Sequence, residues 1–171
     1  MKNISFRNDV LPLKDELFRL ALHITLNREE AEDIVQDTLM KVWNRRDAWD
    51  SIDSIKAFSL TVCRNLSLDH LKRRERQNIS LDETTPAESG PSSSPYEQML
   101  LKDRVRIVRL LIDSLPEKQR TCIQQRDIEG KTYKEIAQFM QISEEQVKVN
   151  IFRARQAIRN KMNNIENNEH A

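Results

Sequence analysis

Glycine is scarce in this chain: its 171 residues include only two, together with five prolines. Glycine adopts positive φ without steric cost, and tight β-turns depend on that freedom. A fold made of many short strands needs such turns at frequent intervals, and this chain has too few residues to build them. The sequence therefore predicts an all-α fold.

Residues 77–100 differ in composition from the rest of the chain. They contain three prolines, Gly90 and a run of three serines, which is typical of a linker. We therefore expect an N-terminal helical module at residues 1–76, a C-terminal module at 101–165 and a disordered tail at 166–171. Both modules are small for independent cores, which favours tight units of three or four helices.

The net charge of +1 conceals two basic modules. Residues 41–76 hold nine basic and five acidic side chains, and residues 101–162 hold fourteen and eight. The linker holds four acidic side chains and no basic one. The basic modules should attract phosphate, and the acidic strip between them should repel it.

Two stretches of the N-terminal module predict helices. The first runs from Arg28 to about Arg45, with Asn27 as its N-cap, and separates an apolar face from a polar one. The polar face is formed by Asp33, Gln36, Asp37 and Met40. The second stretch, Ile55 to Leu71, is apolar on almost all sides and ends in basic residues at 72–76. Such a helix is either central in its module or uses part of its surface for a partner.

Three capping boxes mark helix starts in the C-terminal module, at Ser114–Glu117, Thr132–Glu135 and Ser143–Gln146. Gly130 should close the helix that the first box opens. The other two boxes should open a short helix to about residue 140 and a long one to about residue 162. Only residues 141–143 separate these two helices, which is the spacing of a helix-turn-helix.

The last helix has a second face that its module does not need for packing. Val147, Ile151, Ala154 and Ile158 line one side, whereas Val149 and Phe152 lie on the other among basic residues. Thymine methyls accept apolar contacts, and Arg and Lys bind guanine edges and phosphates. We predict a DNA-reading surface made of Ser143, Lys148, Val149, Phe152, Arg153 and Arg155. The alternative is an ordinary charged face that carries two stray apolar residues.

Several motifs in this chain are similar to those of one known family. Residues 30–43 (EAEDIVQDTLMKVW) resemble the polymerase-binding helix, and residues 63–74 (CRNLSLDHLKRR) the promoter-melting helix, of the extracytoplasmic-function (ECF) sigma factor family. Residues 115–120 (LPEKQR), 133–137 (YKEIA) and 151–155 (IFRAR) match its C-terminal module. The motifs occur in the family's order along nearly the whole chain, with a linker in the expected place.

The resemblance implies partners for the first module and the linker. The face formed by Asp33, Gln36, Asp37 and Met40 would dock on the clamp of the polymerase β′ subunit, although a solvated helix face is the alternative. Further implied partners are the flap of the β subunit, promoter DNA and an anti-sigma factor. The acidic linker would thread the polymerase cleft, or it is a plain tether.

The resemblance also implies a site for the minus-ten promoter element. Trp49, Leu60 and Asn65 would line a pocket for an extruded base, with stacking on Trp49 and hydrogen bonds from Asn65. Phosphates would be held by Lys72, Arg73, Arg74 and Arg76. The alternatives are a core tryptophan, a helix-bending asparagine and a solvated helix end.

The chain departs from the family pattern at three places. Gln141 replaces the usual turn glycine, which costs roughly 1 kcal/mol or more if this residue is left-handed. Residues 146–150 have the sequence QVKVN, where TVKSR is commoner in the family. The upstream promoter element that they recognise is therefore expected to be unusual. Residues 58–61 read FSLT in place of WLYR, which weakens the pocket assignment of Leu60.

Other classes of protein fit less well. A regulator of the response-regulator type would need an α/β receiver domain, and the first half lacks strand-like alternation. We expect no enzyme, cofactor or metal, because no glycine-rich phosphate loop, metal-ligand spacing or Ser/His/Asp grouping occurs. Cys63 and Cys122 form no CxxC pair and should be core residues of a cytoplasmic protein. No apolar run reaches the roughly 18 residues of a membrane span, so direct membrane insertion is not expected.

Overall fold

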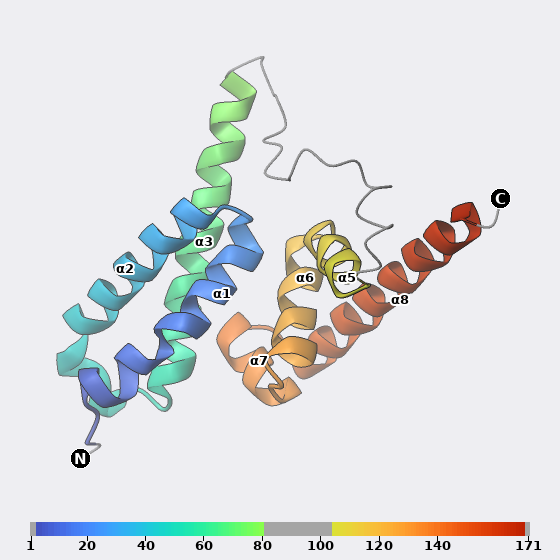
Figure 1. The fold of residues 1–171 in the computed structure, drawn as a ribbon. Helices are drawn as coiled ribbons and strands as arrows, with labels where there is room; N and C mark the ends of the chain where they lie inside the picture. Colours follow the sequence, from blue (N-terminus) through green and yellow to red (C-terminus); the bar gives the residue numbers. More distant parts are fainter. Residues whose placement is uncertain (1–2, 81–103, 170–171) are drawn as a thin grey trace. The chain divides into compact units, whose positions relative to one another are not determined.

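The computed structural model describes residues 3–80 and 104–169 (Figure 1). These residues form α-, 3₁₀- and π-helices and no strand, so the predicted all-α fold is confirmed. The chain divides into two compact units, the first containing α1 to α3 and the second centred on α6 and α8.

The first unit is a bundle of three α-helices in which each helix packs against the other two. Leu17, Leu20, Ile24 and Ile34 are fully buried in it. Its elements are η1 (Phe6–Val10), η2 (Leu11–Leu13), α1 (Lys14–Thr25), α2 (Arg28–Asn44), η3 (Arg46–Ser51) and α3 (Ile55–Ser80).

Local capping explains where α2 begins. The backbone N–H of Glu30 donates to Oδ1 of Asn27 at 3.0 Å, so the predicted N-cap is confirmed. Glu29 and Glu30 then place negative charge at the positive end of the helix dipole. The preceding helix, α1, ends at Thr25, and its C-cap Leu26 has a left-handed backbone with φ of 56°.

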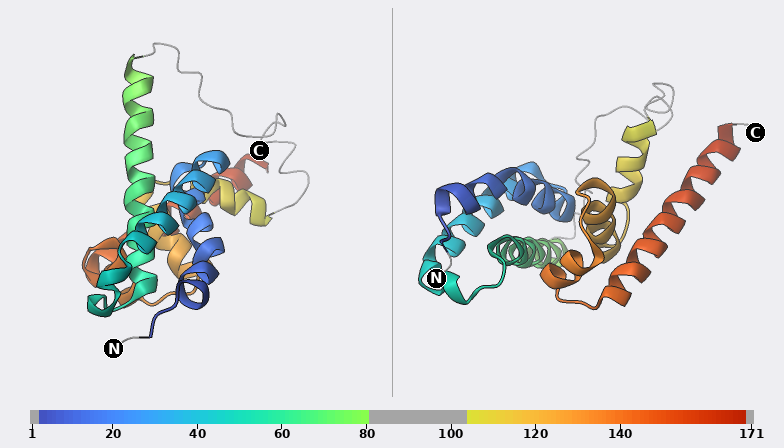
Figure 2. Two further views of the ribbon diagram at one scale, coloured as in Figure 1. Left: turned by 90° about the vertical axis from the view of Figure 1, so that its left-hand side faces the viewer. Right: turned by 90° about the horizontal axis from the view of Figure 1, so that it is seen from below.

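Helix α3 continues through Ser80, four residues beyond the predicted boundary of the module at residue 76. No glycine or proline occurs between Ile55 and Ser80, so the sequence contains nothing that stops the helix earlier. Its C-terminal end extends past α1 and α2 (Figures 1 and 2). The predicted linker therefore begins as helix, and its residues 81–100 lie outside the described residues.

The second unit buries Ile112, Leu115, Ile123 and Ala154 in one cluster, with Val108, Ala157 and Ile158 packed against it. Helix α8 supplies one wall of this cluster and packs against both α5 and α6. The elements are α5 (Arg104–Asp113), α6 (Glu117–Ile123), η4 (Gln124–Ile128), α7 (Tyr133–Met140) and α8 (Glu144–Glu169).

Two of the three predicted capping boxes are confirmed. The N–H groups of Glu135 and Gln146 each donate at 3.1 Å to the hydroxyl oxygens of Thr132 and Ser143. The box at Ser114 is wrong: Pro116 is the N-cap of α6 and no side chain caps this end. The hydroxyl of Ser114 instead donates to the carbonyl of Leu111 at 2.6 Å, at the end of α5.

The turn residues Gly130 and Gln141 both have positive φ. Gly130, with φ of 72°, follows the helix formed by α6 and η4, as predicted. Gln141 has φ of 58°, so a side chain occupies a left-handed position where glycine would be free of strain.

Helix α8 ends later than predicted, at Glu169 rather than near residue 162. Residues 166–169, expected in a disordered tail, are therefore helical, because no glycine or proline interrupts α8. Residues 170–171 of that tail lie outside the described residues. The C-terminal turns of α8 extend past α6 (Figures 1 and 2).

Candidate nucleic-acid and protein interfaces

The predicted polar face of α2 is exposed along its whole length. Asp33, Gln36, Asp37 and Met40 all face solvent, and the Met40 side chain is 63% exposed. The opposite face is buried and consists of Ala31, Ile34, Val35, Thr38 and Val42. The structure thus brings the four predicted residues together on one surface.

Trp43, which the sequence analysis did not single out, extends this face by one turn. Its side chain is 43% exposed. The Phe6 ring meets it edge-on with centroids 5.3 Å apart, and the Arg46 guanidinium lies 4.5 Å from its centroid. Trp43 and Met40 together provide apolar area beside the two carboxylates.

Two of the residues predicted for the minus-ten pocket are buried. Trp49 is 7% exposed, packs with Val10 and Val42, and donates from Nε1 to the carbonyl of Val42 at 3.0 Å. Leu60 is 3% exposed. In this structure Trp49 is a core tryptophan, so neither side chain presents a surface on which a base could stack.

Asn65 does lie at a hollow. The hollow encloses about 320 Å³ between the C-terminal end of α2 and the middle of α3. Its apolar part consists of Phe58, Val62 and Leu66, and its polar part of Lys41, Asn44, Arg45, Asn65 and Asp69. Amide, carboxylate and basic groups together can both donate and accept hydrogen bonds along one edge of a planar ligand. Of these polar residues the sequence analysis predicted Asn65 alone.

The four basic side chains at the end of α3 are not equivalent. Lys72, Arg73 and Arg76 are exposed. Arg74 is half-buried, because its guanidinium pairs with the carboxylate of Glu30 and donates to the carbonyl of Thr25 at 3.0 Å. Arg74 therefore fastens α3 to the α1–α2 connection, and the other three side chains remain accessible to phosphate.

The outer face of α8 carries the predicted apolar and basic side chains in the open. Phe152 is 66% exposed and Val149 is 45% exposed, and Lys148, Arg153 and Arg155 face solvent around them. The inner face is buried at Val147, Ile151 and Ala154. Ser143 has a capping role: its hydroxyl accepts from the N–H of Gln146, and its own N–H donates to the Gln146 side chain at 3.0 Å.

A hollow of about 470 Å³ lies beside Phe152. Tyr133 forms one side of it, with the Arg126 guanidinium 4.4 Å and Lys148 Nζ 5.5 Å from the ring centroid. The remaining lining residues are Lys148, Ile151, Phe152, Arg155, Gln156 and Arg159. Cations around a half-buried tyrosine ring, next to an exposed phenylalanine, suit the sugar–phosphate backbone and bases of nucleic acid.

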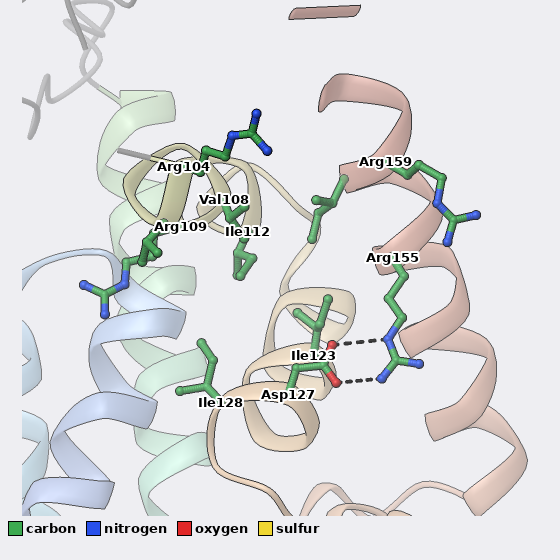
Figure 3. A pocket seen from close by; sticks show the side chains of 11 residues that line it. Arg104, Val108, Arg109, Ile112, Ile123, Asp127, Ile128, Arg155 and Arg159 are labelled. Carbon is green, nitrogen blue, oxygen red and sulfur yellow. Dashed lines mark hydrogen bonds and ion pairs between the residues drawn. The ribbon is translucent and has the colours of Figure 1, made fainter. Parts of the chain in front are cut away.

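A larger groove of about 560 Å³ lies between α5, the end of α6 with η4, and α8 (Figure 3). We call it the α5–α8 groove. Its apolar lining is Val105, Val108, Ile112, Ile123, Ile128 and Ile158, and its basic lining is Arg104, Arg109, Arg155 and Arg159. Among the described residues that line it, Asp127 is the one acidic residue, and it pairs with Arg155. This groove was not predicted from the sequence.

The described residues also bear on metal sites, reactive thiols and membrane-spanning helices. Across residues 3–80 and 104–169 no group of three His, Cys, Asp or Glu side chains could hold a metal ion. Burial raises the pKa of the Cys63 thiol to about 12, so this buried thiol stays protonated at neutral pH. Within the same ranges no helix combines the length and apolar character that a membrane crossing needs.

Each of the two units matches a family of known protein domains. Residues 10–77 match the family model of sigma-70 region 2, and residues 106–158 match that of sigma-70 region 4. The chain is 31% identical over 141 residues to the ECF RNA polymerase sigma-E factor of Salmonella typhimurium (strain LT2), an alignment covering 78% of this chain and 74% of that protein. The chain belongs to the ECF sigma factors.

Other relatives agree with this assignment. The ECF sigma factor SigM of Bacillus subtilis (strain 168) is 26% identical over 156 residues, covering 91% of this chain and 93% of SigM. The fold is similar to that of the sigma factor RpoE in complex with the anti-sigma factor NepR from Bartonella quintana. That match has a TM-score of 0.72 at 23% identity, and covers 92% of this chain and 96% of RpoE. CnrH in complex with the cytosolic domain of CnrY matches with a TM-score of 0.63 at 20% identity, over 92% of this chain and 87% of CnrH.

This ECF sigma factor is an alternative sigma factor that binds core RNA polymerase and directs it to promoters. Its first unit contains region 2 and its second unit most of region 4. The alternative of a regulator of the response-regulator type is not favoured, because region 2 occupies the part of the chain where a receiver domain would lie.

Proposed function

We propose that the two units divide the work of initiation between them. The polar face of α2 docks on the β′ clamp through Asp33, Gln36, Asp37 and Met40, with Trp43 adding apolar area at its end. The outer face of α8 reads the minus-thirty-five element in the major groove. The observation that carries this division is Phe152, a 66% exposed aromatic residue among arginines in the second helix of a helix-turn-helix.

On α8, the side chains that contact DNA are Lys148, Val149, Phe152, Arg153 and Arg155. Val149 and Phe152 supply apolar contacts of the kind that thymine methyls accept, and the basic side chains supply contacts to base edges and phosphates. Ser143 acts at the start of the helix, where its cap fixes the direction in which α8 leaves the turn.

In region 2 we propose that the hollow around Asn65 receives an extruded base of the minus-ten element. The hollow offers Asn65 and Asp69 on α3 opposite Lys41 and Arg45 at the end of α2, which suits the hydrogen-bonding edge of a base. Trp49 and Leu60 support this region from the core. Lys72, Arg73 and Arg76 hold the neighbouring phosphates, and Arg74 keeps the helix end in place.

The α5–α8 groove is proposed as the docking site for the β flap. An apolar lining with arginines around it fits an amphipathic helix that carries acidic side chains. An anti-sigma partner is also proposed, since both solved structures of similar fold are complexes with anti-sigma factors. We expect the protein to act in the cytoplasm without catalytic chemistry of its own.

Transcription in vitro with core polymerase and genomic DNA tests this function. The expected result is a set of promoter-specific transcripts that require the sigma factor. Mapping their start sites would also define the two promoter elements. If no transcripts appear above those made by core polymerase alone, the proposed function is overturned.

A further inference from the structure

The side chain of Arg155 is held by a carboxylate from a different part of region 4. Its Nη2 and Nε donate to Oδ1 and Oδ2 of Asp127 at 2.6 and 3.2 Å. Figure 3 shows the two side chains pointing toward each other, Asp127 from η4 and Arg155 from α8. A bidentate pair of this kind fixes the plane of the guanidinium as well as its position.

The pair leaves one edge of the guanidinium available. Nε and one side of Nη2 face Asp127, so Nη1 and the remaining hydrogen of Nη2 form a second fork. Arg155 is about half exposed, at 48%, and it also lines the hollow beside Phe152. The free fork is therefore accessible from the outer face of α8.

We infer that Asp127 is a positioning residue for promoter recognition: it orients Arg155 so that the free fork of the guanidinium meets the minus-thirty-five DNA. This inference rests on the proposed role of α8. An arginine that is already oriented loses less conformational freedom when it binds, and this favours the one geometry that the specific site offers.

The charge of Asp127 acts in the same direction. Its carboxylate is 40% exposed beside a basic surface, where it weakens attraction to phosphates that are not correctly placed. Non-specific DNA binding comes almost entirely from such phosphate attraction. Asp127 should therefore raise the ratio of specific to non-specific affinity through both effects.

The test compares binding of the full chain to two short duplexes by fluorescence anisotropy. One duplex carries the upstream element of a promoter mapped by in vitro transcription, and the other has the same composition in shuffled order. Asp127→Asn keeps the shape of the side chain and removes its charge, so the specificity ratio should fall by about fivefold or more. Asp127→Glu, which restores the charge, should recover most of the ratio.

Two further comparisons separate positioning from general effects. Glu166→Gln removes one exposed negative charge from the same unit, far along α8, and should leave the ratio within about twofold of the wild type. In an Arg155→Ala background, Asp127→Ala should lower the ratio much less than it does with Arg155 present, because only the charge effect on non-specific binding remains.

The outcomes distinguish this inference from the function on which it rests. A wild-type chain that binds both duplexes equally would overturn the proposed role of α8, and this inference with it. A selective wild type whose ratio is unchanged by Asp127→Asn would overturn the inference alone. So would an Asp127→Ala effect that is as large without Arg155 as with it.

Discussion

Helices α3 and α8 are both 26 residues long, and both carry residues predicted to bind DNA, but they offer DNA very different surfaces. Helix α3 packs against both α1 and α2, and it buries Leu60, Cys63 and Ser67. Helix α8 packs along one side only and leaves Phe152 and Val149 exposed on the other. A central helix can therefore bind through a hollow at its side and through its end, whereas a helix at the surface presents a whole face.

The arginine ion pairs on the two helices also differ, one being part of the bundle and the other lying at the exposed surface. Arg74 near the end of α3 pairs with Glu30 and with the Thr25 carbonyl, which ties the helix to its own bundle. Arg155 in α8 pairs with Asp127 and keeps an exposed fork. A basic residue in a predicted DNA-binding run can thus have a structural role, and burial together with hydrogen-bond partners distinguishes the two cases.

Trp49→Ala has the largest expected effect, because it tests whether Trp49 is a core residue of the first unit. Because Trp49 is 7% exposed and hydrogen-bonded to Val42, we expect the substitution to lower the free energy of unfolding by about 3–5 kcal/mol. Urea denaturation followed by circular dichroism measures this. A loss below about 1 kcal/mol would contradict the core position of Trp49 and return it to the minus-ten surface.

Asp33→Arg combined with Asp37→Arg should weaken binding to core polymerase by about tenfold or more, because two carboxylates at the proposed interface become positive. Neither α3 nor α8 carries these residues, so upstream DNA binding by the free chain should not fall. Fluorescence titration with core polymerase measures the first effect. Glu166→Gln, with a charge change in the other unit, is the control, and equal affinities for the double variant and this control would exclude the α2 face.

Phe152→Ala and Asn65→Ala should have opposite consequences for the two promoter elements. Phe152→Ala should reduce upstream-element selectivity about tenfold while polymerase binding and stability remain, because the ring is exposed. Asn65→Ala should leave upstream selectivity unchanged and impair promoter opening, which permanganate footprinting of the melted region detects. If Phe152→Ala also unfolds the chain or abolishes polymerase binding, Phe152 is a packing residue and α8 resembles α3.

The thiol of Cys63 predicts a dependence of stability on alkaline pH. Its pKa is 9.0 in the unfolded chain and about 12 in the folded one, mainly because burial disfavours the thiolate. The folded state then holds the proton between these values, so stability falls as pH rises above 9, by about 1 kcal/mol at pH 10. Cys63→Ala should lower stability at pH 7 but flatten this decline. Parallel pH profiles for both proteins would contradict the burial of Cys63 in α3.

Gln141→Gly should give the smallest effect and the only stabilising one. Gln141 has φ of 58°, and glycine removes the associated strain, which is worth roughly 1 kcal/mol, less the extra entropy of the unfolded chain. Thermal denaturation measures the shift. Ala in the same position should not stabilise, because it retains Cβ; stabilisation by Ala equal to that by Gly would contradict a strained backbone.

The parts of the fold that the sequence predicts correctly are those set by short-range contacts. The caps at Asn27, Thr132 and Ser143 each involve a partner three residues away, so a local pattern is sufficient to find them. The predicted ends of α3 and α8 are too early. No glycine or proline occurs near either end, so the sequence contains no local signal that fixes where the helix stops. The Ser114 box failed because the N-cap of α6 is Pro116, two residues later, which has no side-chain acceptor.

The sites were predictable to the extent that they depend on one helix. The outer face of α8 and the polar face of α2 follow from helical periodicity alone. The burial of Trp49 depends on Val10, which is distant in sequence, and Asp127 reaches Arg155 across 28 residues. The α5–α8 groove requires three elements to come together, and periodicity along any one of them does not predict it.

Arg155 and Arg159 line both the α5–α8 groove and the hollow beside Phe152. Genetic analysis of such positions would yield pleiotropic alleles, in which one substitution alters promoter choice and holoenzyme assembly together. Suppressors of these alleles should then arise in two unlinked places, the upstream promoter sequence and the polymerase subunit that is proposed to dock in the groove. Substitutions at Phe152, which borders the hollow alone, should be suppressed only by changes in the promoter.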